Sequence, residues 1–245
     1  MTTTDDASTA TLPPETDAAT DAVTGSATGA VTGGRIELRG IGHDYVSTTG
    51  ERIPVLDDID LTIEPGEIVS FVGRSGCGKS TLLNILAGLL TPSRGTLEVA
   101  ARRDGAQSRF GRELPSRAYI TQDDRLLPWR SAQANVALPL ELHRVDKAER
   151  LEAARQILDR VGLGNSLRRR PFELSGGMRQ RVAVAQALVY DPAVLLMDEP
   201  FGALDAWTRR SLHELLADIQ SELNTTTVLV THDVFEAISL SDRVI

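Results

Sequence analysis

The sequence predicts an α/β fold, with a parallel sheet and an inserted helical segment. Three short apolar runs have β character, namely Ile68 to Val72, Ala193 to Met197 and Thr227 to Val230. Between the first and second runs, Lys147 to Val161 has apolar residues at helical spacing. With 41% apolar residues, a chain of 245 residues can bury the core of one large domain.

The first 34 residues differ in composition from the rest. They are nearly all Thr, Ala, Asp, Gly, Ser and Pro, and they contain no Lys or Arg. Such a segment buries too little apolar surface to offset its ordering entropy. Residues 1–34 are therefore predicted to be a disordered acidic tail with a solubilising role, and residues 35–245 to be the folded domain.

The folded part begins with β-like runs at Ile36 to Leu38 and Leu61 to Ile63, ahead of the strand that starts at Ile68. Leu82 to Leu90 has few polar interruptions, which predicts a buried helix. The chain is helical and mixed in charge over about residues 123–190, the predicted insertion.

At the other end, a strand-like segment begins at Arg243 and the sequence stops at Ile245. The domain is therefore expected to be truncated inside a strand.

Charge and hydropathy argue against several classes of protein. A net charge of -8 and a pI near 5.1 argue against sequence-independent DNA or RNA binding, which depends on clustered Lys and Arg. The longest apolar runs, such as Ile85 to Leu90, are much shorter than the roughly 20 residues that cross a bilayer. Cys77 is the only cysteine, and no secretory signal begins the chain. A cytoplasmic location is expected.

A P-loop pattern follows the first strand of the sheet and opens a helix. Its glycines let successive backbone N–H groups face phosphates, and the helix N-terminus favours an anion. Lys79 is expected to reach the β and γ phosphates of ATP, and Ser80 to place its hydroxyl on Mg²⁺. The predicted nucleotide-binding residues here are Gly73, Arg74, Ser75, Gly76, Cys77, Gly78, Lys79, Ser80 and Thr81.

Two carboxylates end the second apolar strand. Asp198 and Glu199 follow Val194 to Met197, so they are expected at the carboxyl edge of the sheet beside the P-loop. This is a Walker B pattern, in which Asp198 would hold Mg²⁺ and Glu199 would act as general base on the attacking water. A solvated turn is the alternative, and the distant P-loop argues against it.

A Leu-Ser-Gly-Gly-Met-Arg-Gln-Arg segment, residues 174–181, begins a predicted helix that runs through Leu188. This segment resembles the signature motif of the ABC ATPase family, and the P-loop and the Walker B strand occur in the same chain. The resemblance implies a P-loop NTPase core with a helical subdomain. It also implies a head-to-tail dimer in which Ser175, Gly176 and Gly177 bind the nucleotide of the partner subunit. Asp205, in a segment similar to the family's D-loop, would cross the dimer interface.

Three further residues match family motifs. Gln122 resembles the Q-loop glutamine, which contacts Mg²⁺ and the γ-phosphate, and His232 resembles the switch histidine at the γ-phosphate. The predicted catalytic residues are therefore Glu199, His232, Lys79 and Gln122, and the predicted metal ligands are Ser80, Gln122 and Asp198. Tyr45 resembles the aromatic residue that stacks on adenine, although a half-buried strand tyrosine is a serious alternative.

A finer resemblance begins at Asp123, where Asp-Asp-Arg-Leu-Leu-Pro-Trp is similar to importers of nitrate, sulfonates and taurine. It implies transmembrane permease subunits, an extracytoplasmic solute-binding protein, and a peripheral position on the cytoplasmic side of the membrane. Leu126, Leu127 and Trp129 would contact a coupling helix of the permease, or else pack inside the insertion; the two hypotheses are equally favoured.

The predicted function is thus ATP hydrolysis coupled to solute uptake. One alternative is a soluble ABC ATPase acting on DNA or ribosomes, but the chain has neither a coiled-coil insertion nor a second cassette. Another is a nucleotide-gated module without hydrolysis. Asp198, Glu199 and His232 argue against it, because together they supply the chemistry for hydrolysis.

Overall fold

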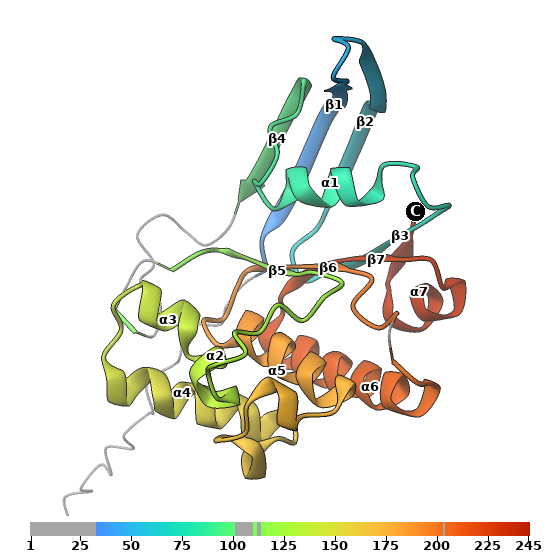
Figure 1. The fold of residues 1–245 in the computed structure, drawn as a ribbon. Coiled ribbons are helices and arrows are strands. Elements are labelled where there is room, and N and C mark those ends of the chain that lie inside the picture. Colours follow the sequence, from blue (N-terminus) through green and yellow to red (C-terminus); the bar gives the residue numbers. More distant parts are fainter. Residues whose placement is uncertain (1–32, 101–109, 112–113, 203) are drawn as a thin grey trace, which may run out of the picture.

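A computed structural model describes residues 33–100, 110–111, 114–202 and 204–245 of the chain. The predicted tail lies outside these residues, except for its last two. Gly33 and Gly34 are buried, and the backbone N of Gly34 donates to the carbonyl of Ala193 at 3.1 Å. The folded part therefore includes these two glycines. Figure 1 shows two sheets, a helix between them, and a layer of helices below the larger sheet.

The larger sheet is parallel, with strand order β5-β6-β7-β3-β8. Its strands are β3 (Ile68–Val72), β5 (Arg117–Ile120), β6 (Val194–Asp198), β7 (Thr226–Thr231) and β8 (Arg243–Val244). The three apolar runs predicted as strands are confirmed as β3, β6 and β7. β5 was not predicted, and it pairs with β6 along its whole length.

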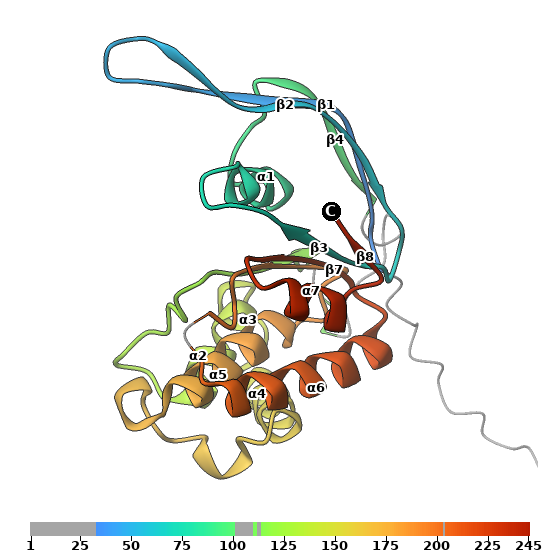
Figure 2. The same cartoon turned by 90° about the vertical axis from the view of Figure 1, so that its right-hand side faces the viewer.

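The smaller sheet is antiparallel, with order β2-β1-β4, and it arches over the helix α1 (Figure 2). Its strands are β1 (Arg35–Val46), β2 (Arg52–Ile63) and β4 (Arg94–Ala100). The first two are much longer than the predicted runs. The pairing of β1 with β2 shifts register after Leu38, where Gly40 has φ +58°, and this bulge hides the strand's alternation in the sequence.

Helix α1 (Lys79–Leu86) is shorter than the predicted helix, which extended to Leu90. Gly88 has φ +74°, a conformation that ends helices, and the backbone N of Leu89 turns back to the carbonyl of Asn84. Leu89 is then 68% exposed rather than buried. The prediction was wrong at this end because apolar content alone does not show where a helix stops.

The parallel sheet separates two hydrophobic cores. Side chains along a strand alternate between its faces, so Val194 and Leu196 of β6 pack with α1 and the smaller sheet, whereas Leu195 and Met197 pack with the helical layer. Both faces are apolar, as expected for a covered parallel sheet. The nucleotide motifs at the strand ends thus rest on a sheet that is held from both sides.

Four helices lie between β5 and β6, and two more follow β6. They are α2 (Ala132–Val136), α3 (Leu138–Leu142), α4 (Lys147–Arg160), α5 (Gly176–Leu188), α6 (Ala206–Leu223) and α7 (Val234–Leu240), with short 3₁₀ turns at Gly164–Ser166 and Pro171–Glu173. The helix predicted over Lys147 to Val161 is confirmed as α4. In the described ranges, no helix combines the length and apolar content that crossing a bilayer requires.

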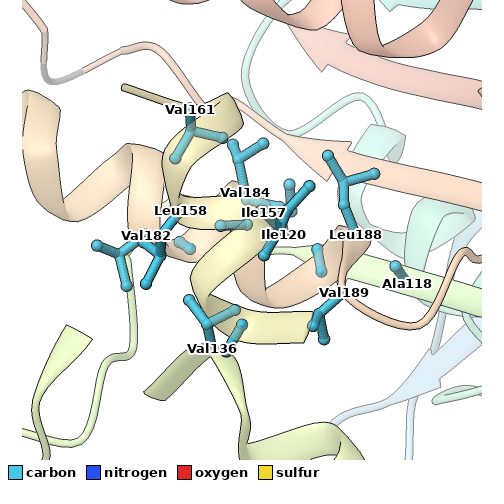
Figure 3. Close-up of a cluster of buried hydrophobic side chains, with 14 of the residues drawn as sticks. Ala118, Ile120, Val136, Ile157, Leu158, Val161, Val182, Val184, Leu188 and Val189 are labelled. Atoms are coloured by element: carbon cyan, nitrogen blue, oxygen red, sulfur yellow. The ribbon is translucent and has the colours of Figure 1, made fainter. Parts of the chain in front are cut away.

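Figure 3 shows how the helical layer is joined to the sheet. Val136 of α2, Leu158 of α4 and Val184 of α5 meet in one buried cluster, which also contains Ala118 and Ile120 of β5. Burial of a side chain of this size contributes about 1.5–3 kcal/mol. The helices are therefore anchored to the strand that leads into residues 121–124.

Asn135 organises the segment between that strand and α2. Its side chain is fully buried. The amide Nδ2 donates to the carbonyls of Leu127, Arg130 and Ser131, at 3.1, 3.2 and 3.1 Å, and Oδ1 accepts from the backbone N of Leu127 at 2.8 Å. One side chain thus holds the backbone of the whole loop.

We expect Asn135→Ala to lower the free energy of unfolding by about 2–3 kcal/mol, because several buried backbone groups lose their partner. Urea unfolding followed by circular dichroism measures this change. The matched control is Gln133→Ala on the same helix, which removes a single bond to the carbonyl of Leu151 and should cost about 1 kcal/mol. Equal losses in the two variants would contradict this role for Asn135.

Candidate active site

The carboxyl ends of four strands meet at one edge of the parallel sheet. In the strand register, Val72 pairs with Thr231, Asp198 with Val230, and Ile120 with Met197. The loops that follow these strands therefore start side by side, which is where ligands bind in open α/β sheets. Every motif predicted to contact the nucleotide within one chain follows one of these strands, except Tyr45 on β1.

The P-loop is a tight turn between β3 and α1. Gly78 has φ +101°, and a Cβ there would lie 2.7 Å from Cδ2 of Leu56 and 3.0 Å from the carbonyl oxygen of Val55, so no other residue fits. Nζ of Lys79 donates to the carbonyls of Gly73 and Arg74, at 2.7 and 2.9 Å. Lys79 thus closes the loop on itself. The residues between, 74–77, are exposed.

Ser80 and Asp198 come together from α1 and β6. The Ser80 hydroxyl donates to Oδ1 of Asp198 at 3.3 Å, and the Tyr119 hydroxyl donates to Oδ2 at 3.4 Å. Burial, followed by the charge of Asp198, raises the pKa of Tyr119 to about 12, so its proton remains on the phenol at neutral pH. Tyr119 was not predicted, since its part in the site depends on the pairing of β5 with β6.

The Ser80 hydroxyl and the Asp198 carboxylate suit Mg²⁺ as ligands. That ion takes oxygen ligands and is usually held by one or two protein oxygens together with substrate phosphates and water. The described residues contain no cluster of three or more His, Cys, Asp and Glu that could hold a metal by itself. A hydroxyl and a carboxylate beside the P-loop can supply the one or two protein oxygens.

Glu199 and His232 form the second pair at this edge. Nδ1 of His232 lies 3.3 Å from Oε2 of Glu199. Glu199 has φ +45°, an unusual conformation for a residue with a side chain, and its backbone N donates to the carbonyl of Val230 at 2.8 Å. The His232 side chain is 63% exposed, so the pair faces the open edge of the sheet.

Tyr45 and Gln122 lie at the margins of this arrangement. Tyr45, on β1, is 43% exposed; its hydroxyl is 3.4 Å from Oγ1 of Thr81, and its ring meets His43 edge-on at 4.8 Å. Gln122 is exposed just after β5. Within the described part of the chain, it makes no hydrogen bond to Ser80 or Asp198.

The residues predicted to act across a dimer lie at the N-terminal ends of α5 and α6. Ser175 caps α5, accepting from the backbone N of Met178 at 3.3 Å, and Asp205 caps α6. No hydrogen bond in the described ranges joins Ser175, Gly176, Gly177 or Asp205 to the P-loop. Gly177 has a further role in packing, because a Cβ there would collide with the Thr208 side chain of α6.

A groove of about 450 Å³ lies between the end of β5, α3 and α5. Its walls are mainly apolar, with a few charged groups at the β5 end. The residues that line the groove include Asp123, Asp124, Arg125, Leu138, Leu142 and Gln186. Leu126 is buried in the helical core at 8% exposure, as expected if these residues pack inside the insertion. Trp129 is 68% exposed, and its contact with a permease stays a prediction. None of Leu126, Leu127 and Trp129 lines the groove.

An ion pair joins the groove to the start of α5. Nε of Arg179 lies 2.8 Å from Oδ2 of Asp124, and its Nη1 donates to the carbonyl of Leu174 at 3.0 Å. Arg179 is in the segment that contains Ser175 and Gly177, so the groove and this segment share a rigid contact. Sequence analysis did not find the pair, because 55 residues separate its members.

Known proteins share this sequence over most of its length. The family model described as ABC transporter matches residues 56–202. The aliphatic sulfonates import ATP-binding protein of Rhodococcus jostii is 50% identical over 211 residues, 86% of this chain and 78% of that protein. The nitrate transport protein of Klebsiella oxytoca is 44% identical, over 86% and 79% of the two chains. The taurine import ATP-binding protein of Escherichia coli O157:H7 is 43% identical, over 84% and 77%.

Solved structures share the fold. A dimeric ATP-binding cassette in a post-hydrolysis state, bound to ADP and Pi, superposes with a TM-score of 0.73 and 32% identity, covering 86% of this chain and 93% of that one. A dimeric bacterial ABC transporter cassette gives 0.72 and 33% over the same shares. The predicted α/β fold, with the core of a P-loop NTPase, is confirmed. By the family model, its relatives and its fold, this chain belongs to the ABC transporter family.

Proposed function

We propose that this chain binds and hydrolyses MgATP as the ATPase subunit of an importer, driving uptake of a small solute of the nitrate, sulfonate or taurine class. The observation that carries the proposal is the meeting of two pairs at one sheet edge, Ser80 with Asp198 and Glu199 with His232. The sulfonate, nitrate and taurine proteins among its relatives support the importer class and the solute class.

In this proposal the P-loop holds the phosphates of ATP. Backbone N–H groups of residues 74–81 and the N-terminus of α1 provide donors and a favourable dipole for an anion. Lys79 exchanges its carbonyl partners for the β and γ phosphates. The exposed ring of Tyr45, whose hydroxyl lies near Thr81, stacks on adenine.

Ser80, Asp198 and Gln122 are the proposed ligands of Mg²⁺, which supplies positive charge to the β and γ phosphates when bound. Tyr119 orients Asp198 by donating to its second oxygen. Glu199 accepts a proton from the attacking water as general base, and His232 donates a hydrogen bond to the γ-phosphate. The 3.3 Å between Glu199 and His232 allows both side chains to act around one reacting group.

We expect Glu199→Gln to lower the rate of phosphate release at least about 100-fold while MgATP binding is retained, because the amide cannot accept the proton. Phosphate release is measured for the purified chain, and size-exclusion chromatography in MgATP should show a stable dimer of the variant.

The control is Glu214→Gln, an exposed change on α6 that should leave the rate within about twofold, as surface pairs contribute little. A chain that binds ATP without releasing phosphate would instead indicate a nucleotide-gated interaction module.

The proposed active unit is a homodimer of this chain. Four residues at the starts of α5 and α6 are exposed or half-buried and, within the described ranges, make no hydrogen bond to the chain's own P-loop, which is consistent with contact across a subunit interface: Ser175, Gly176, Gly177 and Asp205. The two dimeric cassettes with the same fold support this assembly. Backbone N–H groups at the start of α5 would then bind the phosphates held by the partner subunit.

The groove beside α3 is the proposed docking site for a transmembrane permease subunit, which would hold the chain on the cytoplasmic side of the membrane. Its apolar walls, Leu138 and Leu142 among them, suit an inserted helix. An extracytoplasmic solute-binding protein would deliver the solute to that permease. The Asp124–Arg179 pair offers a direct path from the groove to the start of α5.

We expect Asp124→Asn, added to Glu199→Gln, to weaken MgATP-dependent dimerisation roughly three- to tenfold, corresponding to about 1 kcal/mol. The reason is that Arg179 loses the partner that holds it beside the start of α5. Sedimentation over a range of protein concentrations gives the dimer dissociation constant.

The matched control is Asp159→Asn in the same background, since Asp159 pairs with Arg155 on the exposed face of α4. If the two substitutions change the dissociation constant equally, the proposed link is wrong.

Cys77 gives a chemical test of where ATP binds. It is the only cysteine of the chain, it is exposed, and its sulfur lies 3.8 Å from Nζ of Lys79. At MgATP concentrations well above the dissociation constant, alkylation of Cys77 by N-ethylmaleimide should slow about tenfold or more. Mass spectrometry of the labelled chain measures the rate, with glutathione as control for the reagent. Equal rates with and without MgATP would place the nucleotide elsewhere.

A further inference from the structure

Helix α6 directs two polar side chains, Arg209 and His213, toward the loops that carry Glu199 and His232. Their spacing of four residues places them on one face of the helix. Both are largely buried, with side-chain exposures of 31% and 16%. The proposed chemistry of the nucleotide uses neither of them, so their position calls for a separate explanation.

His213 lies between the two loops. On one side, its ring meets the ring of Phe201 edge-on, with 4.6 Å between centroids, and Phe201 comes two residues after Glu199. On the other side, its Nε2 lies 3.0 Å from Oε1 of Glu236, whose side chain is only 6% exposed. A carboxylate in such a place needs a hydrogen-bond partner, because an unpaired charge in the interior is costly.

Glu236 extends this contact to both neighbours of His232. Its Oε2 accepts from the hydroxyl of Thr231, and that hydroxyl accepts from the backbone N of Asp233 at 3.0 Å. Thr231 and Asp233 stand on either side of His232 in the chain. The backbone at His232 is thus fixed from both sides, although its own side chain is mostly exposed.

Arg209 ties the same loop to the segment before α6. Its Nη1 lies 3.3 Å from Oδ2 of Asp233, and its Nη2 donates to the carbonyl of Leu204 at 3.2 Å. Arg209 also lines a small pocket whose wall includes Glu199 and His232. Together with His213, it connects α6 to the segment after Glu199 and to the loop of His232.

We propose that His213 and Arg209 are positioning residues for hydrolysis, which hold the loop of His232 in place against Glu199. The inference rests on the proposed function, in which those two side chains act on the water and the γ-phosphate. Neither positioning residue contacts the P-loop, so their loss changes the rate of hydrolysis and leaves MgATP binding largely intact. A misplacement of about 1 Å in a catalytic group can lower a rate roughly 100-fold.

Two substitutions at His213 separate the hydrogen bond from the packing. His213→Phe keeps a ring against Phe201 and removes the donor to Glu236, whereas His213→Gln restores a donor and removes the ring. The control is Arg210→Ala, an exposed neighbour on α6 whose Nε lies 3.2 Å from Oε1 of Glu214 at the surface. Hydrogen exchange of residues 231–237, measured without nucleotide, and steady-state MgATP hydrolysis are compared for all four chains.

The expected result is that His213→Phe exchanges about tenfold faster over residues 231–237, with kcat about tenfold lower and KM for MgATP within about twofold. His213→Gln should recover both exchange and kcat, and Arg210→Ala should match the unaltered chain. A purely structural role would lower thermal stability and affect the Phe and Gln variants alike, without selective change at this loop.

Unchanged exchange in His213→Phe, or equal losses in the Phe and Gln variants, would overturn the inference. If His213→Phe does not fold, Arg209→Gln gives the same comparison: faster exchange over residues 231–237 supports the inference and unchanged exchange overturns it. An unaltered chain that fails to hydrolyse MgATP would instead overturn the proposed function. The exchange measurement still decides whether His213 and Arg209 hold the loop.

Discussion

The candidate active site depends above all on the register of the parallel strands β3, β6 and β7. Hydrogen bonds between these strands set the relative heights of their carboxyl ends, and each residue of a strand spans about 3.3 Å. A shift of one residue between β6 and β7 would therefore move Glu199 beyond contact with His232, and would also move the side chains of the shifted strand from one core to the other. The packing of both cores and the geometry of the site thus favour the same register.

Contacts made by helices also fix the positions of the loops at this sheet edge. The sheet edge determines where each loop begins, whereas the loops themselves are held from the helical layer, by Arg179 on Asp124 and by His213 on Glu236. These pairs are partly shielded from water, so salt screens them less than pairs on the surface. The helical layer is therefore part of the site, although it contributes few of the groups proposed to contact a nucleotide in its own chain.

Sequence analysis predicted the elements that carry a local signal. Ile68–Val72, Val194–Asp198 and Thr226–Thr231 each contain a run of apolar or β-branched residues, and the P-loop glycines have a fixed spacing. It missed β4 and β5, which are short or half-exposed, and it underestimated β1, whose alternation is broken by a bulge.

Side-chain contacts within the site were the least predictable. Tyr119 and Asp198 are 79 residues apart, Arg179 and Asp124 are 55 apart, and His213 and Glu236 are 23 apart. Such pairs depend on which strands and helices become neighbours, and that order is a property of the whole fold. Local patterns therefore identified the groups proposed to contact the nucleotide, but not the groups that hold them in place.

The backbone of Glu199 has an unfavourable conformation in this arrangement. A residue with a side chain at φ +45° is strained by roughly 1 kcal/mol, and glycine would relieve that strain. Glycine would also remove the carboxylate. Given the proposed role of Glu199 as general base, selection for thermal tolerance and selection for turnover would act in opposite directions at this position, so a library screened only for resistance to heating would accumulate stable proteins that have lost this carboxylate.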